Sequence, residues 1–278
     1  LEFRRVLFRS GLADVLRQAS VPLELLSARA DIVAELFRLS RGDPLLIQLY
    51  VADLMRRGDD AVQLRPEDLG RREPGLAGYF AAWWEDQRVL WGGDSPLREA
   101  EFSQVFNVLS CALGPLRGRE LLELLSADRP VVAWVVDDVM RSLRRFVVGD
   151  GEVQGYAFSH PRLAEYFFDE LQRLGQAEEV EQRFVRWGRQ WLADLASGQR
   201  EPQAVPAYLL QFLRPHLQRA GCGVEDFAAL ASSGWARAWE RLDKGSWSGF
   251  LVDLQGARDA ARAEGDARVA QGQAPLHL

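Results

Sequence analysis

Apolar residues recur at helical spacing through most of the chain, in stripes separated by short polar, glycine-rich or proline-rich segments. The first clear stripe consists of Ile32, Val33, Leu36, Phe37 and Leu39. Asp31 is its expected N-cap, and Gly42 follows as a stop signal. A second stripe begins after Asp43 and Pro44, which suit the N-cap and first position of a helix, and Gly58 is its expected end. We therefore expect two helices joined by a tight turn.

An aromatic-rich segment follows a polar connector that contains one short turn at 66–69. Gly75–Trp91 predicts a helix with a large apolar face. That face is made of Leu76, Tyr79, Phe80, Trp83, Trp84 and Leu90. A surface that stacks nucleic-acid bases interleaves aromatic with basic residues, whereas Glu85 and Asp86 accompany Arg88 here. We expect this face to be core, followed by a loop at 91–96.

The pattern changes at Leu97, after which three short helices precede two short apolar runs. The helices are marked by Phe102, Val105, Phe106 and Leu109, by Leu121, Leu122, Leu124 and Leu125, and by Val131–Leu143. The runs at 146–148 and 156–158 flank a glycine-containing turn and predict a β-hairpin. Three helices followed by a hairpin is the order of a winged-helix domain.

The segment 155–171 leads from the second strand of this hairpin into a further helix. Ser159 or His160 is the expected N-cap and Pro161 the first residue, because proline has a preset φ and no amide proton to leave unpaired. His160 would then lie beside free amides at the positive end of the helix, a place that suits an anion such as phosphate. The alternative is that His160 only caps the helix or packs.

From Gln176 onward the chain again reads as helical. Apolar stripes comprise Val180, Phe184, Trp187, Trp191 and Leu192, then Leu209, Leu210, Leu213 and Leu217, and lastly Phe250, Leu251, Leu254, Ala257 and Ala261. Pro215 predicts a kink in the second of these helices. The expected fold class is therefore mainly α, with a helical lid, a winged-helix domain carrying a small β-hairpin, and an α-helical domain.

Composition restricts the class of protein. Leu1–Ser10 resembles the translation of a common sequencing adapter, so we expect a sequencing or cloning artefact. Without its three arginines and one glutamate, the formal net charge changes from −6 to about −8, which disfavours nucleic-acid binding. Cys111 and Cys222 form no CxxC spacing, and no apolar run is long enough for a membrane span. We expect a soluble cytoplasmic protein.

Several segments resemble catalytic motifs only in outline. Val131–Val136 followed by two aspartates has the outline of a Walker B strand, but its apolar spacing continues as a helix. The P-loop pattern G-x-x-x-x-G-K-[ST] does not occur. Gly245–Gly249 places Trp247 where a nucleophile elbow needs serine. The histidines at 160, 216 and 277 predict no catalytic or metal cluster, so the chain carries no complete catalytic apparatus.

Three segments in this order resemble the regulatory part of STAND NTPases, the NACHT and NB-ARC class of signalling ATPases in the AAA+ group. Residues 37–46 (Phe-Arg-Leu-Ser-Arg-Gly-Asp-Pro-Leu-Leu) resemble the Gly-x-Pro-Leu motif of the helical lid. Residues 155–166 resemble the winged-helix segment around the nucleotide-sensing histidine of that family. Segments between Tyr208 and Leu254 resemble the helical arm that leads to WD or tetratricopeptide repeats in bacterial members.

The resemblance implies a fragment of a nucleotide-regulated switch that binds ADP or ATP, with Mg²⁺ only in the full-length parent. Pro44, within the lid motif begun by Gly42, would pack against adenine, and His160 would contact the β-phosphate of ADP. Many members have Met-His-Asp where this chain has Ser-His-Pro at 159–161, so the acidic contact is absent. Implied partners are a nucleotide-binding domain upstream of Gly11, sensor repeats downstream, and signalling proteins.

The expected domain boundaries follow from this resemblance and from the predicted elements. They are an artefact at 1–10, a helical lid at 11–70, a connecting helix and loop at 71–97, a winged helix at 98–174, a helical arm at 175–263 and a frayed tail at 264–278. Two alternatives stay open: a winged-helix transcription regulator that binds DNA, and a helical protein-interaction scaffold without a nucleotide role. Asp137 and Asp138, between the arginines at 129, 141, 144 and 145, disfavour DNA reading.

Overall fold

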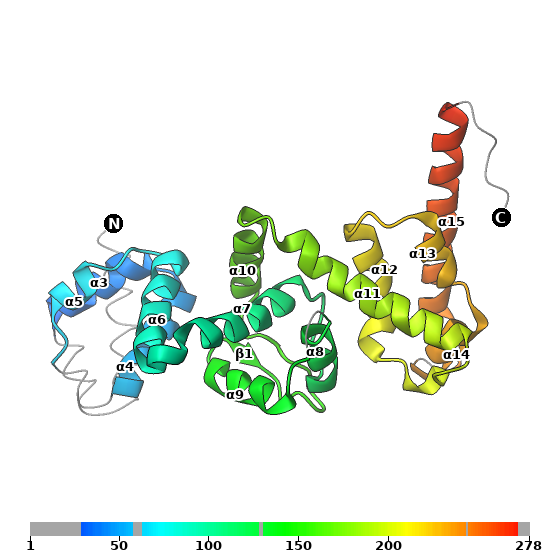
Figure 1. Ribbon diagram of the computed structural model, residues 1–278. Coiled ribbons are helices and arrows are strands. Elements are labelled where there is room, and N and C mark those ends of the chain that lie inside the picture. Colours follow the sequence, from blue (N-terminus) through cyan, green and yellow to red (C-terminus); the bar gives the residue numbers. More distant parts are fainter. Residues whose placement is uncertain (1–28, 58–62, 128–129, 243, 272–278) are drawn as a thin grey trace. The chain divides into compact units, whose positions relative to one another are not determined.

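The computed structural model describes residues 29–57, 63–127, 130–242 and 244–271 (Figure 1). The described part is mainly α-helical and contains one small two-stranded antiparallel sheet, which confirms the mainly α class. The chain forms two compact units, Leu1–Ala100 and Glu101–Leu278. The proposed adapter segment, Gly58 and the residues from 272 onward lie outside the described residues.

The first unit is built from helices that pack around a shared apolar core. Its helices are α3 (Ala30–Ser40), α4 (Pro44–Arg57), α5 (Pro66–Gly70) and α6 (Leu76–Trp91). Helix α3 packs against α4 and α5, and α6 contributes buried Tyr79, whose hydroxyl donates to Asp53 at 2.9 Å. The structure confirms the short turn at 66–69, and it confirms Tyr79, Phe80 and Trp83 of the predicted α6 face as core. Leu90, expected on the same face, is 75% exposed because it lies near the C-terminal end of α6, so this part of the prediction is wrong.

Two more expectations for this unit are wrong. Helix α3 is capped by Arg29, whose backbone is extended, and Asp31 lies in the first turn, where its carboxylate accepts from the Arg29 guanidinium at 2.8 Å. The predicted loop at 91–96 is a 3₁₀ turn, η2 (Gly92–Asp94), that leads directly into α7 (Ser95–Cys111). An ion pair of 2.6 Å between Arg88 and Glu99 ties α6 to the start of α7 across this 3₁₀ turn.

The second unit begins with α7 from Glu101 and contains the predicted hairpin. Its next elements are α8 (Gly118–Leu125), α9 (Ala133–Leu143), β1 (Val147–Val148), β2 (Ala157–Phe158) and α10 (Pro161–Arg173). Val147 pairs with Phe158 in the antiparallel register, and an isolated bridge joins Leu116 to Tyr156. The Walker B-like segment forms coil and then α9, with Val136 and Val139 buried, as helical spacing predicted.

An aromatic stack fixes α10 against α7 and the sheet. The ring of Phe106 lies 4.1 Å from that of Phe167 and 6.0 Å from that of Phe158, nearly parallel to both. Leu163, Phe167 and Leu171, each one helical turn after the last, supply the buried face of α10. The start of α10 is therefore held in place by packing on both sides of the strand-to-helix junction.

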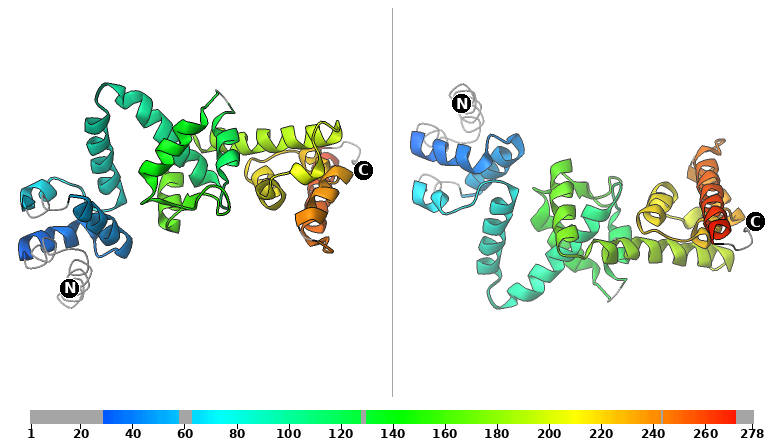
Figure 2. Two further views of the ribbon diagram at one scale, coloured as in Figure 1. Left: turned by 90° about the horizontal axis from the view of Figure 1, so that it is seen from below. Right: turned by 90° about the horizontal axis from the view of Figure 1, so that it is seen from above.

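The remaining elements form a helical layer within the second unit (Figures 1 and 2). They are α11 (Ala177–Ala196), η3 (Pro202–Ala204), α12 (Ala207–Arg219), α13 (Val224–Ala229), α14 (Ser233–Leu242) and α15 (Ser248–Ala270). Helix α11 packs along α12 and contacts α8 and α14. Helix α12 continues through Pro215.

The frayed tail expected from residue 264 is wrong as far as Ala270, because α15 continues to that residue. The segment 263–270 contains the strong helix formers Ala263, Glu264, Ala267, Arg268 and Ala270, which outweigh the poor helix formers Gly265 and Asp266. Nowhere in the described ranges is a helix both long and apolar enough to cross a membrane.

Candidate functional site

His160 is the N-cap of α10, as predicted. Its backbone is extended, with φ −149° and ψ 137°, and its Nδ1 atom accepts a hydrogen bond from the Arg162 amide at 3.2 Å. Pro161 occupies the first helical position, where no amide proton is needed. The side chain is partly exposed, so the ring reaches solvent at the positive end of α10.

The hydrogen bond to Nδ1 defines the tautomer of neutral His160. A ring nitrogen that accepts a hydrogen bond carries no proton, so the proton of the neutral imidazole is on Nε2. No hydrogen bond to Nε2 from the described residues is present. The neutral side chain therefore presents one N–H donor outward beside the free amides of the first turn.

The backbone around His160 is held from the sheet side. The Ser159 amide donates to the Phe146 carbonyl at 2.7 Å, and the Ser159 hydroxyl donates to the Arg145 carbonyl at 3.4 Å. With the Phe158 and Phe167 rings stacked at 5.4 Å, the residues on both sides of His160 are fixed. The imidazole is thus placed on a rigid junction.

Gly42 and Pro44 lie at the turn between α3 and α4 in the first unit. Arg41 and Gly42 both have left-handed backbone conformations, with φ of 52° and 73°, which end α3. The Asp43 carboxylate accepts from the Leu45 amide at 3.0 Å, and Pro44 is the first residue of α4. The structure confirms the predicted turn, cap and proline position. Gly42 and Pro44 are both exposed.

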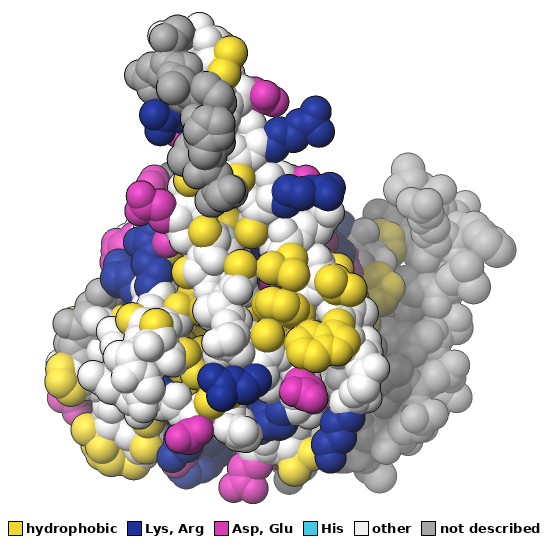
Figure 3. Space-filling view, turned by 90° about the vertical axis from the view of Figure 1, so that its right-hand side faces the viewer, with side chains coloured by type: hydrophobic (Ala, Val, Ile, Leu, Met, Phe, Trp, Pro, Cys, Tyr) yellow, Lys and Arg dark blue, Asp and Glu magenta, His cyan; other side chains and the backbone are white. Residues whose placement is uncertain are grey.

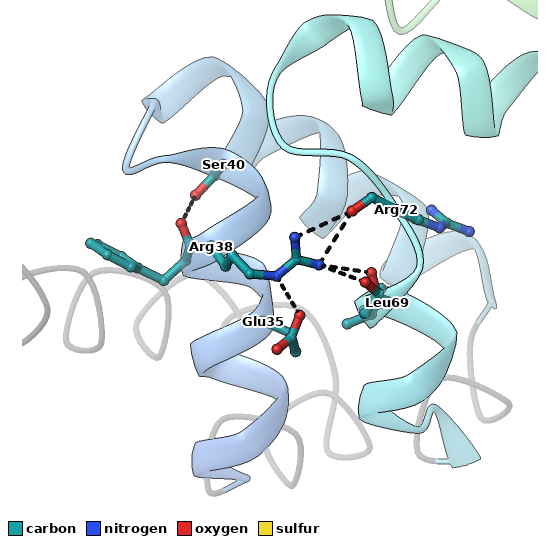
Figure 4. A network of polar contacts seen from close by, with 7 residues as sticks. Glu35, Arg38, Ser40, Leu69 and Arg72 are labelled. Atoms are coloured by element: carbon teal, nitrogen blue, oxygen red, sulfur yellow. Dashed lines mark hydrogen bonds and ion pairs between the residues drawn. The ribbon is translucent and has the colours of Figure 1, made fainter.

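The turn is supported by Arg38 of α3, whose guanidinium reaches the segment after α5 (Figure 4). It donates to the carbonyls of Leu69 at 3.1 Å and Arg72 at 3.3 Å, while Glu35 accepts from its Nε at 2.8 Å. The Ser40 hydroxyl accepts from the Gly42 amide at 3.2 Å. The turn is therefore anchored to the rest of the first unit.

Gly42 and Pro44 belong to the first unit and His160 to the second. The nucleotide contacts assigned to the three residues stay a prediction.

A buried polar network in the second unit was not predicted from the sequence. The Tyr208 hydroxyl lies 2.8 Å from Nε2 of His216, and Nδ1 of His216 hydrogen-bonds to the Glu181 carboxylate. The ring of His216 stacks on Phe184 at 4.2 Å, and the Leu113 amide donates to the Tyr208 hydroxyl at 3.0 Å. These contacts join α11 and α12 to the residues that follow α7.

Charge in this network is balanced by Arg219. Its guanidinium lies 3.7 Å from the Glu181 carboxylate and donates to the Cys111 carbonyl at 3.1 Å. Burial raises the pKa of Tyr208 well above its usual value and the pKa of Cys111 to about 12. One sequence signal pointed here: Tyr208 and His216 are two helical turns apart, on the buried face of α12.

The arrangement resembles a catalytic relay in composition, yet it lies inside the protein. His216 is completely buried and Tyr208 is 3% exposed, so no substrate can reach either ring. The described residues also contain no cluster of three or more His, Cys, Asp or Glu side chains able to hold a metal ion. The network's chemistry is therefore that of a structural junction.

Comparison of the chain with protein-family models, with curated proteins and with solved structures gives no match.

Proposed function

We propose that the protein is the regulatory part of a nucleotide-dependent signalling switch of the STAND type. In this proposal α3 and α4 act as a lid, α7–α10 with the sheet act as a winged-helix module, and α11–α15 act as the arm that transmits the nucleotide state. The order of elements supports this reading, and the bridge between Leu116 and Tyr156 supplies the extra strand pairing common in winged-helix modules.

The observation that carries the proposal is the state of His160. Because Nδ1 accepts from the Arg162 amide, the neutral ring presents Nε2–H outward at a helix N-terminus. A donor beside free amides and a positive dipole suits a phosphate oxygen. By resemblance, that oxygen belongs to the β-phosphate of ADP.

Protein partners are the second element of the proposal. Figure 3 shows hydrophobic side chains gathered on the face formed by the C-terminal helices. Trp247, Leu251 and Val252, near the start of α15, are about half exposed. An exposed apolar patch of this kind suits a protein contact, in keeping with an arm that passes a signal onward.

A DNA-binding role is less well supported. On α9, Trp134 is 64% exposed, and Asp137 is exposed beside an Asp138–Arg141 pair at 3.5 Å. A helix that reads the major groove needs a basic and polar outer face to meet the phosphates and base edges. The outer face of α9 fits a protein contact better than a DNA contact. An exposed face of this kind is expected both for the switch and for the protein-interaction scaffold.

The first test is the gene. A G-x-x-x-x-G-K-[ST] pattern encoded upstream of the Gly11 codon, followed by an apolar strand ending in acidic residues, would support the switch. A start codon close to Gly11 without such a pattern would overturn it in favour of the scaffold.

The second test is ADP release from the complete protein. His160→Ala removes both the cap and the Nε2 donor, whereas His160→Asp retains a capping oxygen and carries no donor. We expect both variants to release ADP faster, with only His160→Ala losing stability. Glu165→Ala, exposed on the same helix, is the matched control. Release rates equal to the control would remove His160 from the mechanism.

A further inference from the structure

Arginine side chains gather around one cavity of the second unit. A cavity of about 480 Å³ lies in the second unit, between α8 and the helical layer. Four arginines, Arg117, Arg119, Arg200 and Arg241, line it together with Glu120 and Glu123. Its size lies within the range of about 300–1,000 Å³ usual for small-molecule sites. Because four arginines face two glutamates, the lining of the cavity is positively charged, although the formal net charge of the chain is −6.

Two of the guanidinium groups are fixed by the protein. Arg241 donates to the Val205 carbonyl at 2.8 Å. Arg200 pairs with Asp194 at 2.9 Å and lies over the ring of Trp191 at 4.0 Å. Such groups keep further N–H donors for a ligand, because a guanidinium has five.

The other two guanidinium groups, on Arg117 and Arg119, are exposed. No ion pair to either is present within the described part of the chain. Arg117 is the N-cap of α8, and its amide donates to Glu120 at 2.8 Å. Both groups can turn toward a bound anion without breaking an existing pair.

The two carboxylates of the cavity are already engaged. Glu120 is 6% exposed, accepts from the Arg117 amide, and has a pKa raised by burial. Glu123 accepts from the indole N–H of Trp187 at 2.6 Å. They offset only part of the arginine charge.

Two helix N-termini and one buried N–H group also favour a negatively charged ligand in this cavity. The first turns of α8 and α12 both line the cavity, through Arg119 and Ala207, and first-turn amides have no acceptor within their helix. Trp191 is 6% exposed, and its indole nitrogen is buried without a hydrogen-bond partner in the described structure. A buried N–H group without a protein acceptor can donate to a molecule bound in the cavity.

We propose that this cavity binds a small phosphate-bearing molecule, gripped by Arg117, Arg119, Arg200 and Arg241 at the junction of α8 with α11, α12 and α14. Arginine forms bidentate hydrogen bonds with phosphate oxygens, so several arginines around one space favour phosphate over a singly charged anion. A bound phosphate would bridge the hairpin-containing part of the second unit and its helical layer. The site is independent of the nucleotide contact proposed for His160.

The test is calorimetric titration of inorganic pyrophosphate into the complete chain at low ionic strength. Arg119→Glu is the informative variant, because an acidic residue in the first turn of α8 favours the helix and leaves folding intact. We expect its affinity for pyrophosphate to fall about tenfold or more, as for loss of a charged hydrogen bond. Arg262→Glu, exposed on α15, makes the same charge change outside the cavity and should bind normally.

Four outcomes would overturn the proposal. They are no heat or thermal stabilisation with pyrophosphate in the unchanged chain, an equal loss in Arg119→Glu and Arg262→Glu, loss of pyrophosphate binding in His160→Ala, and citrate binding as tightly as pyrophosphate. The last would show a general carboxylate or charge effect instead of phosphate recognition. Normal pyrophosphate binding by His160→Ala separates this site from the proposed nucleotide contact, and its loss there would count against the cavity.

Discussion

The hydroxyl of Tyr208 lies 2.8 Å from Nε2 of His216, and both side chains are buried. The Leu113 amide donates to the same hydroxyl. Because a carboxylate only accepts, the neutral His216 ring carries its proton on Nδ1, facing Glu181, and Nε2 then accepts from the Tyr208 hydroxyl. Each polar group has a partner, and the chain of bonds connects the end of α7 with α12 and α11.

Tyr208→Phe is expected to destabilise the second unit. The substitution leaves the Leu113 amide and Nε2 of His216 buried without a partner, which costs about 2 kcal/mol of unfolding free energy. Urea denaturation of the complete chain, followed by circular dichroism, measures the change. Tyr156→Phe is the control, because Tyr156 is only partly buried, and should change stability by less than about 0.5 kcal/mol. Equal stability of the two variants would show that the network contributes nothing.

Glu120 predicts a pH dependence with a definite sign. Burial raises the pKa of Glu120 above its ordinary value of 4.5, so the folded state holds this proton more tightly than the unfolded state does. Its contribution to stability is therefore complete below pH 4.5 and is lost as pH rises through the raised pKa.

Glu120→Gln should remove this dependence while keeping an oxygen for the Arg117 amide. We expect the variant to equal or exceed the original chain in melting temperature at neutral pH, and to lose that advantage toward pH 4.5. Melting curves over this pH range give the comparison. If the difference in melting temperature between Glu120→Gln and the original chain became less favourable to the variant from pH 4.5 to neutral pH, the predicted direction of the pH dependence would be wrong.

Local chemistry explains which elements were predictable. Caps and first-turn prolines at Asp43 with Pro44, and at His160 with Pro161, act within three residues, and both occur as expected. Alternation of polar and apolar residues around a glycine turn likewise defines the hairpin. The start of α3 and the end of α15 were predicted wrongly, and the causes are tertiary contacts in the first case and local composition in the second. The start of α3 depends on Arg29, which donates to the distant Leu64 carbonyl at 2.9 Å.

The polar network and the arginine cavity could not be predicted, because their members are far apart in the chain. Glu181 and His216 are separated by 35 residues, and Glu123 and Trp187 by 64. A single sequence shows that a glutamate lies beside an apolar stripe, but it does not show which distant side chain that glutamate contacts in the folded protein. The four arginines likewise line one cavity only because folding brings the start of α8, the residues after α11 and the end of α14 together.

The two cysteines should differ in reactivity. Cys111 is completely buried, and burial raises the pKa of its thiol to about 12, whereas Cys222 is partly exposed. At pH 8 iodoacetamide should label Cys222 and leave Cys111 unmodified in the folded chain, since the thiolate is the reactive form. Peptide mass spectrometry reads both sites, and labelling in urea shows that both are reactive when unfolded. Labelling of Cys111 first would contradict the packing at the end of α7.

The turn between α3 and α4 offers a last prediction. Gly42 has a φ of 73°, a conformation that costs a residue with a β-carbon about 1 kcal/mol. Gly42→Ala should lower the unfolding free energy of the first unit by about that amount, even though no atom would clash with the added methyl group more closely than 3.7 Å. Gly70→Ala is the matched control, because Gly70 lies in α5 without positive φ and with open space around it. It should be neutral or slightly stabilising, so similar losses in both variants would show that backbone conformation at Gly42 is not the cause.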